Sequence, residues 1–465
     1  MKIKKSEGVT RTEEQLSALC NRTFLKLWSY PNPFKEDRKE LCDLIAVFSD
    51  HVFIFFDRES RKLEGAINDI HVACRRWKKE AVEKQINTAR GAERYVRSRR
   101  PIYLDKKCKD TFPLEITTET KIHKIIVAHG ASKACKALSE DNIYGSLAIS
   151  YSHNSPPISF MLNSPFPCMI NLDRDDPVHV LDSHNLPILF GELDTFFDFV
   201  SYLTEKECAL KRYELLIYCG EEDLIAHYFL NYDRKQNSYR IGTGEKDSIG
   251  LCIREGEWKD FFESDAYARR KEANRISYVW DKVIQITCQN AMDGTLLGDT
   301  DLFKGKNALR EMAKEPRFSR RFLSEHIIKI IENFPETEEK IVRQPFFMSS
   351  PWYQDKGYVF LQFKHSDITD YDNDYRLQRR EMLKIVCGVI KNKLPHLNKV
   401  IGIAINPPKY SRVDDADFVL LECHNWTKKN EDYFHSKNVG FKFFQTDRIH
   451  ETHQNVSDFP VDSPN

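Results

Sequence analysis

The chain has 465 residues, with 70 basic and 70 acidic side chains and therefore no formal net charge. A single hydrophobic core rarely supports that length, so we expect more than one domain. Hydrophobic residues make up 41% of the chain, which is enough for globular packing and excludes a disordered protein. The balanced charge excludes binding to nucleic acid through a global positive field, and leaves local basic clusters to consider.

The twelve cysteines occur as singlets without a C-x-x-C pair. This spacing argues against a structural zinc site, and cysteines inside apolar runs, such as Cys42 and Cys387, are expected to be small buried hydrophobes. Such usage is typical of a reducing compartment. The N-terminal segment lacks the apolar core of a signal peptide, and no stretch approaches the roughly 18 apolar residues of a membrane span. We therefore expect a soluble, cytoplasmic protein that does not contact a membrane.

The first structural signal is a helix before residue 28. Thr10 or Thr12 can cap it, and apolar residues then recur at helical spacing. Glu13 lies on the same side as this apolar stripe, and Glu14 follows it. A carboxylate in the first turn is either a site residue or a favourable charge near a helix N-terminus.

A β-hairpin is predicted next. Two runs rich in Val, Ile and Phe, 44–48 and 51–56, are separated by a polar pair. Asp43 opens the first strand, and Asp57 and Glu59 close the second. Because side chains alternate along a strand, Asp57 and Glu59 share a face, with Asp43 close by. Three carboxylates at one sheet edge form a hard-oxygen site suited to Mg²⁺.

These residues resemble the PD-(D/E)XK nuclease superfamily, which has a restriction-endonuclease-like fold, over residues 10–100. Members carry a Glu on a helix, then an Asp at the head of a strand, then (D/E)-x-K at the end of the paired strand. The resemblance assigns the helical acid to Glu13 or Glu14 and the strand acids to Asp43 and Asp57. It implies a Mg²⁺- or Mn²⁺-dependent endonuclease in which Asp43 and Asp57 hold the ion, with Glu13 joining directly or through water.

One position departs from the family pattern, because Glu59 stands where Lys is usual. Some members carry Glu there, and Lys62 or Arg58 could reach the site from the following turn. On this resemblance, Glu59 or Lys62 positions or deprotonates the attacking water. The missing lysine equally favours a competing hypothesis, a catalytically degenerate domain that binds nucleic acid or acts as a scaffold. In a third interpretation, the acids merely end strands at a solvated edge.

The stretch 66–100 predicts a helix with a strongly basic face. Its position directly after the candidate metal site favours contacts to backbone phosphates, although a solvated helix face is the alternative. Gln85 is included because a RecB-like branch of the superfamily carries a Gln on this helix. The predicted nucleic-acid-binding residues are Arg75, Arg76, Lys78, Lys79, Gln85, Arg90 and Arg94.

Composition shifts along the remaining chain predict an α/β and α+β multidomain protein. We expect a restriction-endonuclease-like domain over 1–114, a mixed α+β middle domain over 115–340 and an α/β module over 341–465. Histidines in the β-rich part are expected to be satisfied polar residues rather than metal ligands. They are His123, His129, His153, His179 and His184.

The C-terminal module has the clearest alternation. A strand over 358–363, a helix over 375–393 and strands over 399–405 and 417–423 predict a βαβ-like unit. The helix is expected to bury one apolar face, made of Leu377, Met382, Ile385, Val386 and Val389.

The resemblance also bears on biological role. Nuclease domains with long extensions occur among bacterial restriction and anti-phage proteins, and by analogy we expect DNA rather than RNA as substrate. A homo-oligomer or a partner protein of a defence system is expected on the same grounds.

Overall fold

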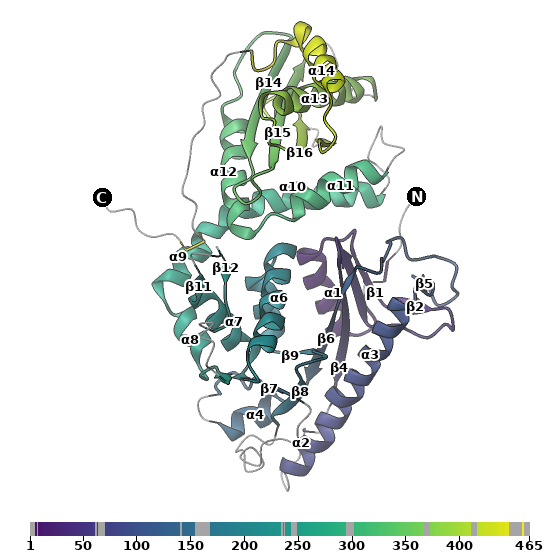
Figure 1. Ribbon diagram of the computed structural model, residues 1–465, viewed down its shortest axis with the longest axis vertical. Coiled ribbons are helices and arrows are strands. Elements are labelled where there is room, and N and C mark those ends of the chain that lie inside the picture. The colour runs from purple at the N-terminus through teal and green to yellow at the C-terminus, as the bar shows by residue number, and fades with distance from the viewer. Residues whose placement is uncertain are drawn as a thin grey trace. The chain divides into compact units, whose positions relative to one another are not determined.

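The structure is a computed structural model, in which the chain divides into two compact units, Lys4–Tyr267 and Ala268–Asn465 (Figure 1). We call them the N-terminal unit and the C-terminal unit. Both combine helices with β-sheets, as expected for a mixed α/β protein. The residues that the structure describes are 5–6, 8–60, 63, 70–139, 142–153, 168–233, 236, 238–242, 249–293, 302–366, 373–410, 416–445 and 458–459.

The main sheet of the N-terminal unit has the strand order β1-β3-β4-β6-β9. Its members are β1 (Ser29–Pro31), β3 (Leu44–Phe48), β4 (His51–Glu59), β6 (Lys121–His129) and β9 (His179–Asp182). The first three strands pair antiparallel, and β4, β6 and β9 run parallel. The predicted hairpin is confirmed by β3 and β4, whose turn begins at Ser49 in the left-handed region, with φ 56°.

This sheet contains strands from both sides of the domain boundary predicted at residue 114. Strand β4 pairs along its whole length with β6, which lies beyond that position. A parallel pair needs a long crossover, here α2 (Ile70–Lys78), the π-helical turn η1 (Lys79–Glu83) and α3 (Lys84–Arg97). The helix predicted over 66–100 corresponds to this crossover from residue 70 onward, and residues 66–69 lie outside the described residues. The connector after it leads back into the same sheet.

A second sheet, of order β13-β10-β7-β8, completes the N-terminal unit. Its strands are β7 (Ala148–Ser152), β8 (Ile170–Asp173), β10 (Leu215–Cys219) and β13 (Gly250–Cys252). Two short strand pairs are β2 (Phe34–Lys35) with β5 (Ile102–Tyr103), and β11 (Tyr232–Asp233) with β12 (Ser238–Tyr239). The other helices are α1 (Arg11–Thr23), α4 (Ser132–Leu138), α5 (Asn185–Glu192), α6 (Phe196–Arg212), α7 (Glu221–Leu230) and α8 (Glu257–Phe262).

Aromatic packing shows which helices cover the main sheet. Phe53 of β4 stacks on Phe24, just after α1, at 4.6 Å between ring centroids, and Phe199 of α6 packs on both. Helices α1 and α6 therefore cover one face. On the opposite face Lys124 of β6 pairs with Glu93 of α3 at 2.7 Å, and Figure 1 shows α3 running beside β4 and β6.

Cys74 of α2 and Cys168, just before β8, form a disulfide. A disulfide is not expected in the reducing compartment that the cysteine usage predicted. The partners are 94 residues apart in sequence, and such a pairing cannot be deduced from spacing alone.

The C-terminal unit is built on a sheet of order β14-β15-β16-β17. Its strands are β14 (Ile341–Ser349), β15 (Lys356–His365), β16 (Lys399–Ile405) and β17 (Ala416–Glu422). Its helices are α10 (Tyr278–Asp293), α11 (Leu302–Ala313), α12 (Arg317–Glu332), α13 (Asn373–Lys393) and α14 (Lys428–Phe441), after α9 (Asp265–Asn274) and a 3₁₀ turn, η3 (Arg275–Ser277). Strands β15 and β16 are parallel and joined through α13, so the βαβ prediction is confirmed.

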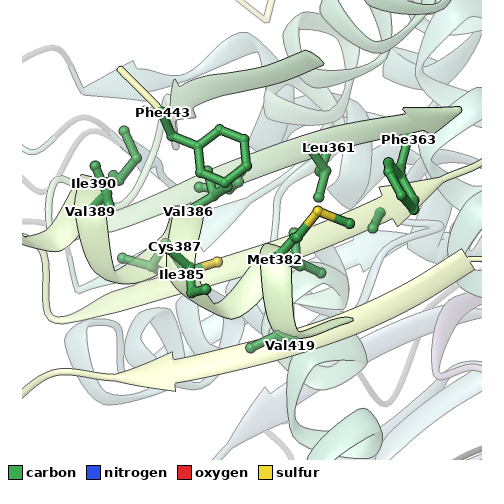
Figure 2. Close-up of a cluster of buried hydrophobic side chains, with 14 of the residues drawn as sticks. Leu361, Phe363, Met382, Ile385, Val386, Cys387, Val389, Ile390, Val419 and Phe443 are labelled. Atoms are coloured by element: carbon green, nitrogen blue, oxygen red, sulfur yellow. The ribbon is translucent and has the colours of Figure 1, made fainter. Parts of the chain in front are cut away.

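Helix α13 buries most of the predicted apolar face. Figure 2 shows Met382, Val386 and Val389 in the core with residues of the sheet. Leu377 was predicted to join them but is 49% exposed. At 100° per residue it lies about 140° around the helix from Met382, outside the stripe that faces the sheet.

Candidate metal centre at the sheet edge

The strand acids meet at one edge of the main sheet. Strand β3 begins opposite Phe55, near the end of β4, and the N–H of Asp43 donates to the carbonyl oxygen of Phe55 at 3.1 Å. Asp57 lies near the end of β4. Its backbone N–H donates to Oδ2 of Asp43 at 2.5 Å. The hairpin thus fixes these two carboxylates at the same edge.

Asp57 has an unusual environment for a carboxylate. Its side chain is only 1% exposed, yet neither oxygen accepts a hydrogen bond from any described residue. Nε2 of His129 lies 2.8 Å from Oδ1 but is not aligned as a hydrogen-bond donor. A buried carboxylate normally has donors on both oxygens, because an unsatisfied charge in the interior is costly. A cation at this position would satisfy it.

Two further acids approach the pair from α1 and the β1–β3 connection. Nδ2 of Asn32 donates to Oε2 of Glu13 at 3.2 Å and to Oε1 of Glu40 at 2.6 Å. The N–H of Asn32 donates to the carbonyl oxygen of Asp43 at 2.9 Å, which ties this bridge to the strand. Glu13 is half-buried on this side, whereas Glu14 is exposed. Glu13 is thus the helical acid that lies with the strand acids.

The electrostatics of Asp43 reflect this crowding. Burial raises its pKa to about 7, and the negative charges of Glu40, Glu13 and Asp57 add to the rise. The N–H of Asp57 opposes the shift. Carboxylates that repel one another in a partly buried site favour a divalent cation, which offsets the repulsion.

His129 joins the site, although its sequence context predicted an ordinary polar residue. It ends β6, opposite Glu59 of the parallel neighbour β4. Its Nδ1 lies 2.6 Å from Oγ of Ser183, which directly follows β9. A histidine at the C-terminal end of a strand, followed by Gly130, would have been a usable signal only with the pairing of β4 and β6 known.

The residues at the acid-x-Lys position point in different directions. Glu59 is exposed at the strand end, and Arg58 lies on the opposite face, 3.9 Å from Glu80 of η1. Lys62 lies outside the described residues. Among those that are described, the structure brings Asp43, Asp57 and Glu13 together and does not bring Arg58 to them.

The basic helix reaches the same edge of the sheet, but only some of its predicted nucleic-acid-binding residues are exposed. Nε1 of Trp77 donates to the carbonyl oxygen of His129 at 2.9 Å, which places the end of α2 beside the strand ends. Arg90 instead pairs with Asp176 at 2.6 Å, and Lys78 donates to the carbonyl oxygen of Met169. Gln85 is half-buried on the crossover, and the exposed members of the predicted set are Arg75, Arg76, Lys79 and Arg94.

Comparison with protein-family models, curated proteins and solved structures finds no match to this chain. No helix in the described part of the chain combines the length and apolar character that crossing a membrane requires.

Proposed function

We propose that the N-terminal unit hydrolyses phosphodiester bonds of nucleic acid with Mg²⁺ or Mn²⁺, as an endonuclease acting on DNA rather than RNA. The observation that carries this proposal is the buried carboxylate of Asp57, neither oxygen of which accepts a hydrogen bond from a described residue, together with the carboxylate of Asp43, which accepts from the backbone N–H of Asp57. The order of elements also fits the superfamily resemblance: a helix with Glu13, a strand headed by Asp43, and a paired strand ending in Asp57.

Each residue has a defined task in this proposal. Asp43 and Asp57 hold the ion, and Glu13, held by Asn32, joins them directly or through water. When bound, the ion supplies a more acidic water and stabilises the developing charge on the phosphate. Contact with His129 limits the orientations open to Asp57. Glu59 or Lys62 orients or deprotonates the attacking water.

Substrate binding is assigned to the exposed basic residues of the crossover, Arg75, Arg76 and Lys79. They lie within four residues of Trp77, which anchors α2 to the strand edge. Lysine and arginine contacts to phosphates give affinity without sequence preference. A cytoplasmic location, a defence partner and an anti-phage role belong to the same proposal and rest on the superfamily resemblance alone.

The test is cleavage of plasmid, linear duplex, single-stranded DNA and RNA with Mg²⁺ or Mn²⁺. Wild type is compared with Asp43→Asn and Asp57→Asn, and with Glu14→Gln as a control on an exposed acid beside Glu13. We expect metal-dependent cleavage that falls at least about 100-fold in both strand variants and is unchanged in the control. Binding without cleavage under every metal would instead favour the degenerate nucleic-acid-binding domain. The absence of both binding and cleavage would refute the proposal.

A further inference from the structure

A second cluster of ligand-type side chains lies on the same face of the main sheet, away from the acidic edge. His123 of β6 and His179 of β9 face Glu207 of α6. His123 precedes His129 by six residues, which corresponds to about 20 Å along the strand. The two clusters are therefore separate, and the proposed nuclease chemistry does not use the second one.

The donor atoms have the spacing of a metal site. Nδ1 of His123 lies 3.0 Å from Oε1 of Glu207, and Nε2 of His179 lies 3.5 Å from the same oxygen. All three ligand atoms lie within 4.8 Å of one another. Around a tetrahedral Zn²⁺ with bonds of about 2.0–2.1 Å, neighbouring donors are about 3.3 Å apart. Both measured separations are close to that edge length.

Outer contacts orient two of the three ligands, whereas Nδ1 of His179 is buried and has no hydrogen-bond partner among the described residues. Nζ of Lys121 lies 2.7 Å from Oε2 of Glu207, which leaves Oε1 turned toward the imidazoles. Nε2 of His123 lies 2.9 Å from Nδ1 of His51, so His123 can donate there while Nδ1 binds an ion. Its ring also stacks on Phe53 at 4.9 Å. A metal-binding histidine usually donates a hydrogen bond from its other ring nitrogen to a second partner.

Burial also suits a cation. His123 and His179 are buried, and the Glu207 side chain is 15% exposed, so one of the three ligands reaches solvent.

We propose that His123, His179 and Glu207 form a binding site for a borderline transition metal of the Zn²⁺ class, with water as the fourth ligand. Two imidazoles and one carboxylate select such ions over Mg²⁺, which prefers an all-oxygen shell. The alternative is a metal-free network in which the imidazoles only hydrogen-bond to Glu207. Lys121 serves either arrangement, because it contacts the oxygen that faces away from the imidazoles.

The experiment titrates Co²⁺ into the chelator-treated, dialysed full chain carrying Asp43→Asn and Asp57→Asn, so that the acidic edge does not contribute. We expect one Co²⁺ per chain with the intense visible absorption of a tetrahedral ion, displaced stoichiometrically by Zn²⁺ and not by millimolar Mg²⁺. Glu207→Gln, which keeps the size of the side chain, and His179→Ala should each weaken binding at least 10-fold. The exposed His153→Ala is the matched control and should leave binding unchanged.

Two results would overturn the proposal. One is the absence of stoichiometric Co²⁺ or Zn²⁺ binding in the folded parent, checked by circular dichroism. The other is binding that persists unchanged in Glu207→Gln. If His179→Ala fails to fold, the parent titration and Glu207→Gln still decide. None of these readouts depends on nuclease activity, so a failure here is distinguishable from a failure of the proposed function.

Discussion

The backbone N–H of Asp57 donates to the carboxylate of Asp43 at 2.5 Å, so the candidate metal ligand Asp43 also closes the open end of the β3–β4 hairpin. Stability and ion binding can be separated at this residue. Asparagine keeps an acceptor oxygen in the same place, whereas alanine leaves a backbone donor without its partner. The two substitutions are therefore expected to differ in their effect on stability.

Asp43→Asn should keep the stability of the metal-free protein, and Asp43→Ala should lose about 1–3 kcal/mol. Both should abolish stabilisation by Mn²⁺. The measurement is chemical denaturation with chelator and with millimolar Mn²⁺. If Mn²⁺ stabilised Asp43→Asn as much as wild type, Asp43 would be a structural strand end only.

The basic helix should contribute to nucleic-acid affinity through its exposed residues. Replacing Arg75, Arg76 and Lys79 with alanine should weaken duplex DNA binding for every sequence. The slope of log affinity against log salt should become shallower by about 0.9 for each phosphate that the variant no longer neutralises. Fluorescence anisotropy at several salt concentrations measures both effects.

Arg90→Ala is the matched control on the same crossover, because Arg90 is already paired with Asp176 at 2.6 Å. It should leave the salt slope unchanged and cost at most about 1 kcal/mol of stability, since the pair is partly exposed. An equal loss of affinity in the control would show that the effect of the triple variant is not specific to the strand edge.

A buried ion network should stabilise the C-terminal unit. Asp281 of α10 accepts from Arg317 at 2.8 Å and from Arg320 at 2.6 Å, both on α12. Burial alone would raise the pKa of Asp281, but the two guanidinium groups outweigh it and hold the pKa below its usual value. Asp281→Ala would remove the carboxylate that lies between these two buried guanidinium groups and should cost about 3–5 kcal/mol at pH 7.

The pH dependence follows from the lowered pKa. The contribution of Asp281 is present above the pKa of an unfolded aspartate, about 4, and is lost as the pH falls further and the folded state takes up the proton. The difference between wild type and Asp281→Ala should therefore shrink below pH 4. Hydrogen exchange of α10 and α12 measures it, with Glu431→Ala, from an exposed pair with Lys428, as a control expected to change by less than about 0.5 kcal/mol.

The disulfide between Cys74 and Cys168 should be detectable by thiol counting. Alkylation of the denatured, unreduced chain should modify ten cysteines, and reduction should make all twelve reactive. Reduction should lower the free energy of unfolding by about 2–4 kcal/mol. Cys208→Ser, which replaces an exposed free thiol, should leave the free energy of unfolding unchanged. Twelve reactive thiols before reduction would show that the pair is open, as expected in a reducing compartment.

Sequence reasoning succeeded where the determining interactions are local. The capping of α1 depends on Thr10 accepting from the N–H of Glu13, three residues away. The hairpin depends on a polar turn between two apolar runs. The prediction for Leu377 was wrong because hydrophobicity alone placed it in the buried stripe of the helix, although its angular position excludes it.

The groupings of site residues that the sequence did not predict depend on which strands are neighbours, and no short segment specifies that. Asp57 meets His129 only because β4 and β6 are parallel neighbours, and their sequence positions differ by 72 residues. His123 and His179 approach Glu207 for the same reason, across β6, β9 and α6. Sequence spacing carried no sign of either grouping, so the histidines were expected to be ordinary polar residues.

The parallel pairing of β4 with β6 also decides when and how the N-terminal unit can fold. During synthesis the sheet stays incomplete until β9 has left the ribosome, and a high contact order of this kind slows folding. A fragment ending at residue 114 would expose the long apolar edge of β4, with unpaired backbone groups that recruit other chains into aggregates. A shortened chain that is to contain this sheet should therefore extend at least through β9.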